Sequence, residues 1–215
     1  MGIGLYRSYQ FFLRRIGRFT CDLQIFGREH LIENGPLIIA ANHASFFDPM
    51  LLGVTYDRPL SFMARESLFS ASRFFSWVIR QTFAFPLKHG ATAKDALRLF
   101  EERLKNDLAV VLFPEGTRSK DGRYVKSESA IGMLSTRSNA PIQPVYVMGS
   151  WHAWPRFQKY PRVGPMRVYV GPAIYPKANL ARGDKRAEQN RLNAAYEQAL
   201  LDFEQQAWRE FQEQS

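Results

Sequence analysis

The chain has 215 residues, of which 46% are hydrophobic and 23% are charged. These are the proportions of an ordinary globular protein, and the length suits one domain or one domain with a small appendage. The composition therefore excludes disordered, collagen-like and low-complexity classes. The single cysteine, Cys21, cannot by itself form an internal disulfide or a cysteine-based zinc site, which indicates a reducing compartment.

The positive charge is unevenly distributed along the chain. The formal net charge is +9, and residues 1–175 carry 23 basic and 13 acidic side chains, against 6 and 7 in the last forty residues. The positive field of the main body points to an anionic partner, which can be a nucleic acid, a phospholipid surface or a phosphorylated substrate. Charge alone does not choose among these three.

Residues 3–19 are predicted to form an amphipathic helix. Apolar residues recur at spacings of three and four, and arginines fall on another face: Leu5, Tyr9, Phe12, Ile16 and Phe19, with Arg7, Arg14 and Arg18. The helix either packs on the core through its apolar stripe or lies in a membrane interface, where its arginines meet lipid phosphates.

Arginines interrupt the apolar stretches, near the N-terminus and again at Arg73 and Arg80. We therefore expect no continuous transmembrane helix, which takes roughly 20 apolar residues, and no signal peptide. The sequence predicts a peripheral or monotopic protein on the cytoplasmic face of the cell membrane.

From Leu37 onward, short apolar strands alternate with helices. The predicted strands are 37–41, 60–64, 82–87, 108–113, 143–148 and 167–170, and the predicted helices are 49–56, 68–80, 93–105, 129–138 and 184–211. This alternation predicts an α/β fold with a largely parallel mixed sheet covered by helices on both faces. We expect three parts: an N-terminal amphipathic membrane-interface helix (1–24), a main domain (25–180) and a C-terminal helix packed on it (181–215).

The segment Asn42–Pro49 (NHASFFDP) begins where the first apolar strand ends. Ligands of open α/β sheets bind at the carboxyl ends of strands, so His43 lies where chemistry is expected. Histidine is the usual general base near neutral pH, and a carboxylate on its other nitrogen fixes its tautomer.

Asp48 is the candidate carboxylate, five positions after His43. On a regular helix the two side chains would be roughly 140° apart, so the segment must bend for them to meet. Pro49 favours a bend because a residue before proline avoids the helical region. The alternative is that Asp48 simply caps the helix opened by Pro49.

A second candidate segment, Phe113–Ser119 (FPEGTRS), follows the most apolar predicted strand. In it, Gly116 allows close backbone approach and Arg118 can hold a phosphate bidentately. The alternative is a turn with an ordinary surface arginine. Lys88 and Lys126 are candidates for further positive charge at the same mouth.

Together these segments resemble the glycerolipid acyltransferase family typified by 1-acyl-glycerol-3-phosphate (lysophosphatidate) acyltransferases. Asn42, His43, Ser45 and Asp48 match the motif N-H-x-S-x-x-D, and Phe113–Ser119 reproduces F-P-E-G-T-R-S in full. Ala140–Val145 is similar to the family's proline-bounded strand. The chain departs from the family at Thr82–Lys88, which has Thr and Lys where Gly and Arg are usual, and at Glu128, where glycine is usual.

The resemblance implies transfer of a fatty acyl chain from acyl carrier protein or acyl-CoA to the free hydroxyl of 1-acyl-sn-glycerol-3-phosphate, giving phosphatidic acid. His43 would take the proton from the acceptor hydroxyl, and Asp48 would orient His43, with Asn42 and Ser45 in support. The thioester is a co-substrate, and neither a metal nor an organic cofactor is implied.

The resemblance also implies a binding role for the second segment. Arg118, with Lys88 and Lys126, would hold the acceptor phosphate, Glu115 and Gly116 would shape the glycerol pocket, and Thr117 would also bind substrate. The expected partners are the acyl donor, the lyso-lipid and an anionic membrane surface, and no nucleic acid is expected.

Two alternatives stay open. The acceptor can instead be another lyso-lipid or glycerol 3-phosphate. A basic, aromatic-rich domain can also be a non-catalytic module that binds anionic lipid or nucleic acid, and the segment Trp151–Phe157 suits base stacking as well as a membrane interface. The distinguishing feature is whether basic residues converge on His43.

Overall fold

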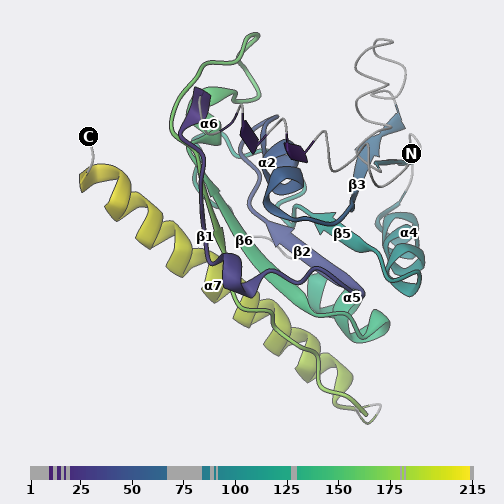
Figure 1. Cartoon of the computed structure of the whole chain (residues 1–215). Helices are drawn as coiled ribbons and strands as arrows, with labels where there is room; N and C mark the ends of the chain where they lie inside the picture. The colour runs from purple at the N-terminus through teal and green to yellow at the C-terminus, as the bar shows by residue number, and fades with distance from the viewer. Residues whose placement is uncertain are drawn as a thin grey trace.

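The computed structural model of the chain describes residues 10–11, 14–15, 17, 20–66, 84–87, 90, 92–126, 130–179, 181 and 183–213 (Figure 1). The strands within these ranges form one sheet in the order β1-β7-β6-β2-β5-β3-β4. They are β1 (Gln24–Phe26), β2 (Leu37–Ala41), β3 (Leu60–Arg65), β4 (Phe85–Leu87), β5 (Ala109–Leu112), β6 (Ile142–Met148) and β7 (Arg167–Val170). Each described pairing is parallel except that of β6 with β7.

The described helices are the short η1 (Arg28–His30), α2 (Asp48–Thr55), α4 (Ala93–Lys105), α5 (Ile131–Ser138), α6 (Ser150–Ala153) and α7 (Lys185–Glu213). Figure 1 shows α7 as a long helix along one side of the sheet, with α2 on the other side. The predicted α/β architecture, with a mixed and largely parallel sheet between helices, is therefore confirmed.

The central strand β2 shows why the sheet is covered on both faces. All five of its residues are buried, as expected for a parallel strand with helices above and below. Leu37, Ile39 and Ala41 join a core cluster with α2. Ile38 and Ala40 join a second cluster with α4, α5 and α7. Each fully buried Leu or Ile stabilises the fold by roughly 1.5–3 kcal/mol.

The predicted elements match to different degrees. Strands 37–41 and 167–170 and helix 93–105 are confirmed residue for residue. The helix 93–105 begins at a capping box, in which the Thr92 backbone N–H donates to the Asp95 carboxylate (2.8 Å) and the Asp95 N–H donates to the Thr92 hydroxyl (3.3 Å). The other predicted elements within the described residues differ by one to three residues at an end, and the predicted helix 68–80 lies outside the described residues. The short elements β1, η1 and α6 were not predicted.

The described part of the N-terminal segment packs against the end of α2. Gln10 donates hydrogen bonds to the carbonyls of Gly53 and Tyr56, both at 2.8 Å. The Arg14 guanidinium bonds the Val54 carbonyl and pairs with Asp57, so it satisfies the C-terminal end of that helix. Most of the predicted helix 3–19 lies outside the described residues. Over the ranges the structure covers, no helix is both long and apolar enough to span a bilayer.

Candidate active site

The loop after β2 folds around the carboxylate of Asp48. Asp48 Oδ2 lies 2.8 Å from His43 Nδ1 and accepts hydrogen bonds from the backbone N–H groups of Ala44 and Ser45, both at 2.7 Å. Asp48 is fully buried. Hydrogen bonds from these three donors stabilise the bend that brings His43 and Asp48, five positions apart, into contact.

The capping alternative for Asp48 is wrong. The N-cap of α2 is Phe47, Asp48 is the first residue of the helix, and no side chain caps it. The carboxylate turns back toward residues 43–45 and away from the amides of α2. The acidic residue before Pro49 therefore orients a histidine.

The imidazole of His43 is held on two sides. Because a carboxylate accepts hydrogen bonds, its contact with Nδ1 assigns the proton to Nδ1 and leaves a lone pair on Nε2. The ring stacks on Phe113 with a centroid distance of 4.0 Å and an interplanar angle of 18°. The side chain is 20% exposed, so it is fixed in orientation and still reachable from solvent.

The loop 113–119 clamps the backbone of His43. The His43 N–H donates to Glu115 Oε1 at 2.8 Å, and the His43 carbonyl accepts from the Ser119 N–H at 2.7 Å. Between these contacts, the Gly116 N–H bonds the Phe113 carbonyl at 3.0 Å and Gly116 adopts a φ of 66°, which glycine tolerates without strain. The two sequence motifs therefore form one structural unit.

Glu115 is an unusual carboxyl group. Burial raises its pKa to about 7, against the opposing effect of hydrogen bonds from the His43 and Val125 amides. The nearby carboxylates of Asp48 and Glu204 raise the pKa further. Its hydrogen bonds are with the backbone N–H groups of His43 and Val125; contact with substrate glycerol stays a prediction.

Arg118 lies over an aromatic platform beside the same loop. Its guanidinium carbon is 3.7 Å from the centroid of the Phe46 ring, a cation–π contact that orients the plane of the donors. Phe46 and Phe47 pack on Trp154 with centroid distances of 5.1 and 5.2 Å. The predicted phosphate ligand is thus held next to the segment that carries His43.

Asn42 and Ser45 act as structural supports. Asn42 exchanges two hydrogen bonds with the backbone of Val147 on β6, at 2.7 and 3.0 Å. The Ser45 hydroxyl donates to the Trp154 carbonyl at 2.8 Å and accepts from the Phe47 N–H at 3.1 Å. Both residues tie the loop to the neighbouring β6–α6 segment.

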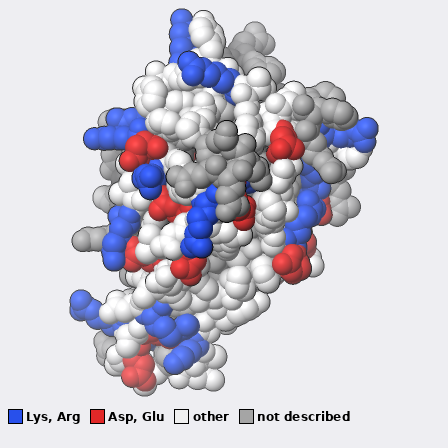
Figure 2. Space-filling view, turned by 90° about the vertical axis from the view of Figure 1, so that its left-hand side faces the viewer, with Lys and Arg blue, Asp and Glu red and all other residues white. Residues whose placement is uncertain are grey.

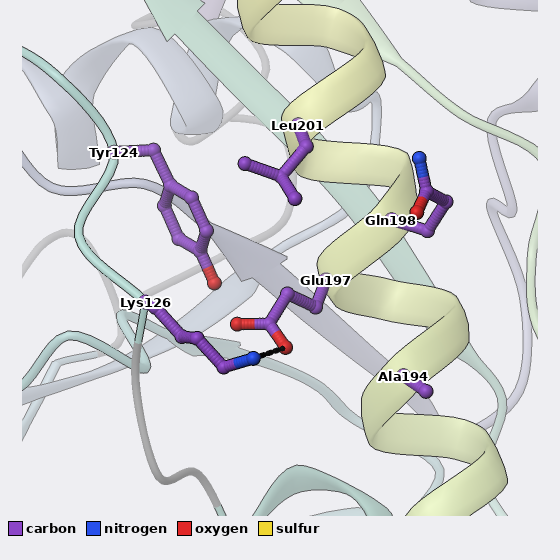
Figure 3. A pocket seen from close by; sticks show the side chains of 6 residues that line it. All are labelled: Tyr124, Lys126, Ala194, Glu197, Gln198 and Leu201. Carbon is purple, nitrogen blue, oxygen red and sulfur yellow. Dashed lines mark ion pairs between the residues drawn. The ribbon is translucent and has the colours of Figure 1, made fainter.

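Of the two predicted lysines, the structure describes Lys126 alone. Lys88 lies outside the described residues. Lys126 is 81% exposed, and its Nζ lies 3.0 Å from Glu197 Oε2 on α7. Figure 3 shows its side chain directed toward Glu197. These two residues line a pocket of about 360 Å³ together with Tyr124, Ala194, Gln198 and Leu201. Thr117 is exposed at the tip of the turn.

Sequence reasoning missed a support from α7. The Tyr124 N–H donates to Glu204 Oε1 at 2.8 Å, and the Tyr146 hydroxyl lies 3.4 Å from the same oxygen. The available signal was periodicity, since Glu204 falls four residues after the buried Leu200 and three before the buried Ala207, on the stripe where apolar residues are expected. The roles of Phe46 and Phe113 as ring platforms were also not predicted.

The fold and this geometry define a class of protein. It is an α/β protein that sets a histidine–carboxylate pair at the carboxyl end of a central strand, beside an arginine suited to an anionic group. Across the described ranges, no cluster of three or more His, Cys, Asp or Glu side chains could hold a metal ion.

The chain belongs to the Acyltransferase family, whose profile matches residues 22–148. It is 28% identical over 173 residues to a chloroplastic 1-acyl-sn-glycerol-3-phosphate acyltransferase of Brassica napus, covering 78% of this chain and 49% of that protein. It is 26% identical over 180 residues to the human beta enzyme of the same name, covering 83% and 62%. The chain thus spans only about half to two thirds of these relatives.

A solved structure has the same fold. The crystal structure of the 1-acyl-sn-glycerophosphate acyltransferase PlsC from Thermotoga maritima superposes with a TM-score of 0.67 at 23% identity. The match covers 90% of this chain and 79% of that one.

Proposed function

We propose that this chain transfers a fatty acyl group from acyl carrier protein or acyl-CoA to the hydroxyl of 1-acyl-sn-glycerol-3-phosphate, giving phosphatidic acid. The names of the relatives support the acceptor. The observation that carries the chemistry is the 2.8 Å contact between His43 Nδ1 and the buried Asp48, inside the region matched by the family.

His43 Nε2 accepts the proton of the acceptor hydroxyl as its oxygen attacks the thioester carbonyl. Asp48 stabilises the imidazolium that forms. The tetrahedral intermediate then expels the thiolate, which takes the proton back from His43. The bond from the acyl carbon to the acceptor oxygen replaces the bond to sulfur, so the step needs neither oxidant nor metal and forms no acyl-enzyme.

Arg118 binds the acceptor phosphate in this proposal, since a guanidinium can bind two phosphate oxygens at once. Lys88 is kept as an assisting cation on the strength of the sequence alone. Because the acceptor and the product are bilayer lipids, the protein works at an anionic membrane surface, which we place on the cytoplasmic face. The strong basic character of residues 1–175 supports this.

The deciding experiment supplies purified protein with detergent-dispersed lysophosphatidate and either acyl-CoA or acyl carrier protein loaded with a fatty acid. We expect phosphatidic acid with one donor or both. Glycerol 3-phosphate and phosphate-free lyso-lipids serve as competing acceptors. Faster turnover of one of these would replace the acceptor and keep the acyl transfer, whereas no product with any pair would overturn the proposal.

A further inference from the structure

The loop after α6 presents apolar side chains to solvent. Phe157, Tyr160 and Val163 are 68%, 68% and 73% exposed. Each follows directly on an exposed basic residue: Arg156, Lys159 and Arg162. We refer to residues 155–164 as the 155–164 loop. Its pairs of one cation and one apolar side chain recur every three residues.

The loop itself has a uniformly positive charge. Residues 155–164 include three basic and no acidic residues. Among the described side chains, Figure 2 shows basic but no acidic ones at the upper end of the face displayed, where the loop after α6 protrudes in Figure 1. A charge distribution of one sign attracts an anionic surface over about a Debye length, roughly 8–10 Å.

Hydrogen bonds within residues 153–162 hold the loop in this conformation. The Arg162 N–H donates to the Ala153 carbonyl at 2.8 Å, and the Gln158 N–H donates to the Pro155 carbonyl at 3.1 Å. The Trp154 indole N–H donates to the Gln158 carbonyl at 3.2 Å. The three apolar side chains are therefore held outward by an ordered turn, although water is an unfavourable environment for them.

The base of the loop is continuous with the candidate active site. The Trp154 carbonyl accepts hydrogen bonds from the Ser45 hydroxyl at 2.8 Å and the Phe46 N–H at 3.3 Å. The Trp154 ring packs on Phe46, which lies under Arg118. A lipid held by the loop therefore has a short path along aromatic side chains to the proposed phosphate ligand.

We propose that the 155–164 loop is a membrane-contact loop. Phe157, Tyr160 and Val163 enter the headgroup layer of an anionic bilayer, while Arg156, Lys159 and Arg162 meet lipid phosphates. Aromatic side chains suit this layer because it is apolar on one side and wet on the other. A bilayer fits better than a nucleic acid, since Val163 offers nothing for base stacking. The delivery of lipid toward Arg118 rests on the proposed function; the membrane contact does not.

The first test measures vesicle binding of the full chain by sedimentation, with phosphatidylcholine vesicles with and without phosphatidylglycerol. Replacing Arg156, Lys159 and Arg162 together by Gln should weaken binding to the anionic vesicles at least about tenfold at low salt, since each cation contributes roughly fivefold. Replacing Phe157, Tyr160 and Val163 together by Ser should remove the binding that survives high salt.

Matched controls lie far along the chain. Lys185→Gln with Arg186→Gln removes two exposed cations of α7, and Tyr175→Ser removes a 63% exposed ring. Neither control should change vesicle binding by more than about twofold. Melting temperatures of all variants should match the wild type, because the replaced side chains are exposed.

A second test reports insertion directly. In a Cys21→Ser background, an environment-sensitive dye on Tyr160→Cys should brighten and shift to shorter wavelength with anionic vesicles, whereas the dye on Tyr175→Cys should not. Equal spectra at both positions, or loop variants that bind vesicles like the wild type, would overturn the proposal.

The assays separate this inference from the proposed function. Loop variants should lose turnover of bilayer-presented lysophosphatidate and keep turnover of a short-chain, water-dispersed one. If the wild type makes no phosphatidic acid but the loop variants lose vesicle binding, the proposed function fails and the membrane contact stands. If vesicle binding is unchanged but the KM for acyl carrier protein rises, the loop docks that protein and the inference is wrong.

Discussion

Two loops near the same edge of the sheet orient their polar and apolar groups in opposite ways. The loop 42–47 turns its polar groups inward, with the Asp48 carboxylate accepting three hydrogen bonds and Asn42 bonded to β6. The 155–164 loop turns apolar side chains outward. The first holds atoms at fixed distances, and the second offers a surface. In the two proposals, positioning a base and collecting a lipid belong to separate segments, both of which form hydrogen bonds with Trp154.

The comparison predicts that substitutions in the loop 42–47 impair turnover of both dispersed and bilayer-presented substrate. The largest effect is expected for His43→Ala, which should lower kcat by about 10² to 10⁴, the usual contribution of a positioned general base. The measurement is kcat on dispersed substrate beside the melting temperature, which should change little. His30→Ala is the control. Near-wild-type turnover of the His43→Ala variant would contradict the catalytic role proposed for the loop 42–47.

Asp48→Asn should lower kcat roughly 10²-fold, toward the lower end of the general-base range, because an amide no longer fixes the required tautomer. It should also destabilise the fold by about 1–3 kcal/mol, because a neutral amide oxygen is a weaker acceptor than the carboxylate for the buried donors of residues 43–45. Denaturant unfolding checks the stability and initial rates check the turnover. A stability loss with unchanged kcat would make Asp48 a purely structural residue.

Arg118→Ala should act on binding of the acceptor more than on the chemical step. We expect KM for lysophosphatidate to rise about 10- to 100-fold, in line with a charged hydrogen bond of 1.5–3 kcal/mol. The KM of the Arg118→Lys variant should fall between those of the wild type and Arg118→Ala, since lysine keeps the charge but lacks the planar face that lies on Phe46. Arg137→Ala, which removes an arginine paired with Glu101, is the control. An equal rise of KM for a phosphate-free acceptor would contradict phosphate binding.

We expect the smallest effect for Glu115→Gln, which should change the stability of the fold only within a pH window. Burial raises the pKa of Glu115 from 4.5 to about 7, so the folded chain binds this proton more tightly than the unfolded chain. Its contribution to stability is therefore full below pH 4.5 and lost as the pH rises to about 7. Glutamine keeps an oxygen acceptor for the His43 amide and does not titrate.

The Gln variant should therefore gain stability relative to the wild type across that window, by on the order of 1–3 kcal/mol. Denaturant unfolding at several pH values on both sides of the window measures the difference. Parallel stability curves for the two proteins would show that Glu115 titrates normally.

The fold was predictable wherever a strand is buried on both faces. Leu37–Ala41 reads as an uninterrupted apolar run because helices cover both sides of it. By contrast, β1 was missed because its three residues, Gln24–Phe26, are only partly buried at the sheet edge. Such a strand is formed by its pairing with β7, and no local pattern reports a pairing across more than a hundred residues.

One contact of the candidate site was predictable from the sequence and the others were not. The spacing of His43 and Asp48 predicted the pair once a bend was allowed. The contact of Glu115 with the His43 backbone was not predictable, because a side-chain-to-backbone bond across 72 positions leaves no residue pattern. The ion pair of Lys126 with Glu197 was not predictable for the same reason, since Glu197 lies on α7.

The two hydrogen bonds from the loop 113–119 to the His43 backbone limit how such chains can vary. Because β2 and β5 are paired in register, the loop after β5 that bonds the His43 backbone begins beside the loop after β2, with the two strands about 4.8 Å apart. A one-residue slip of β5 against β2 would displace Glu115 and Ser119 from the His43 backbone and abolish this arrangement.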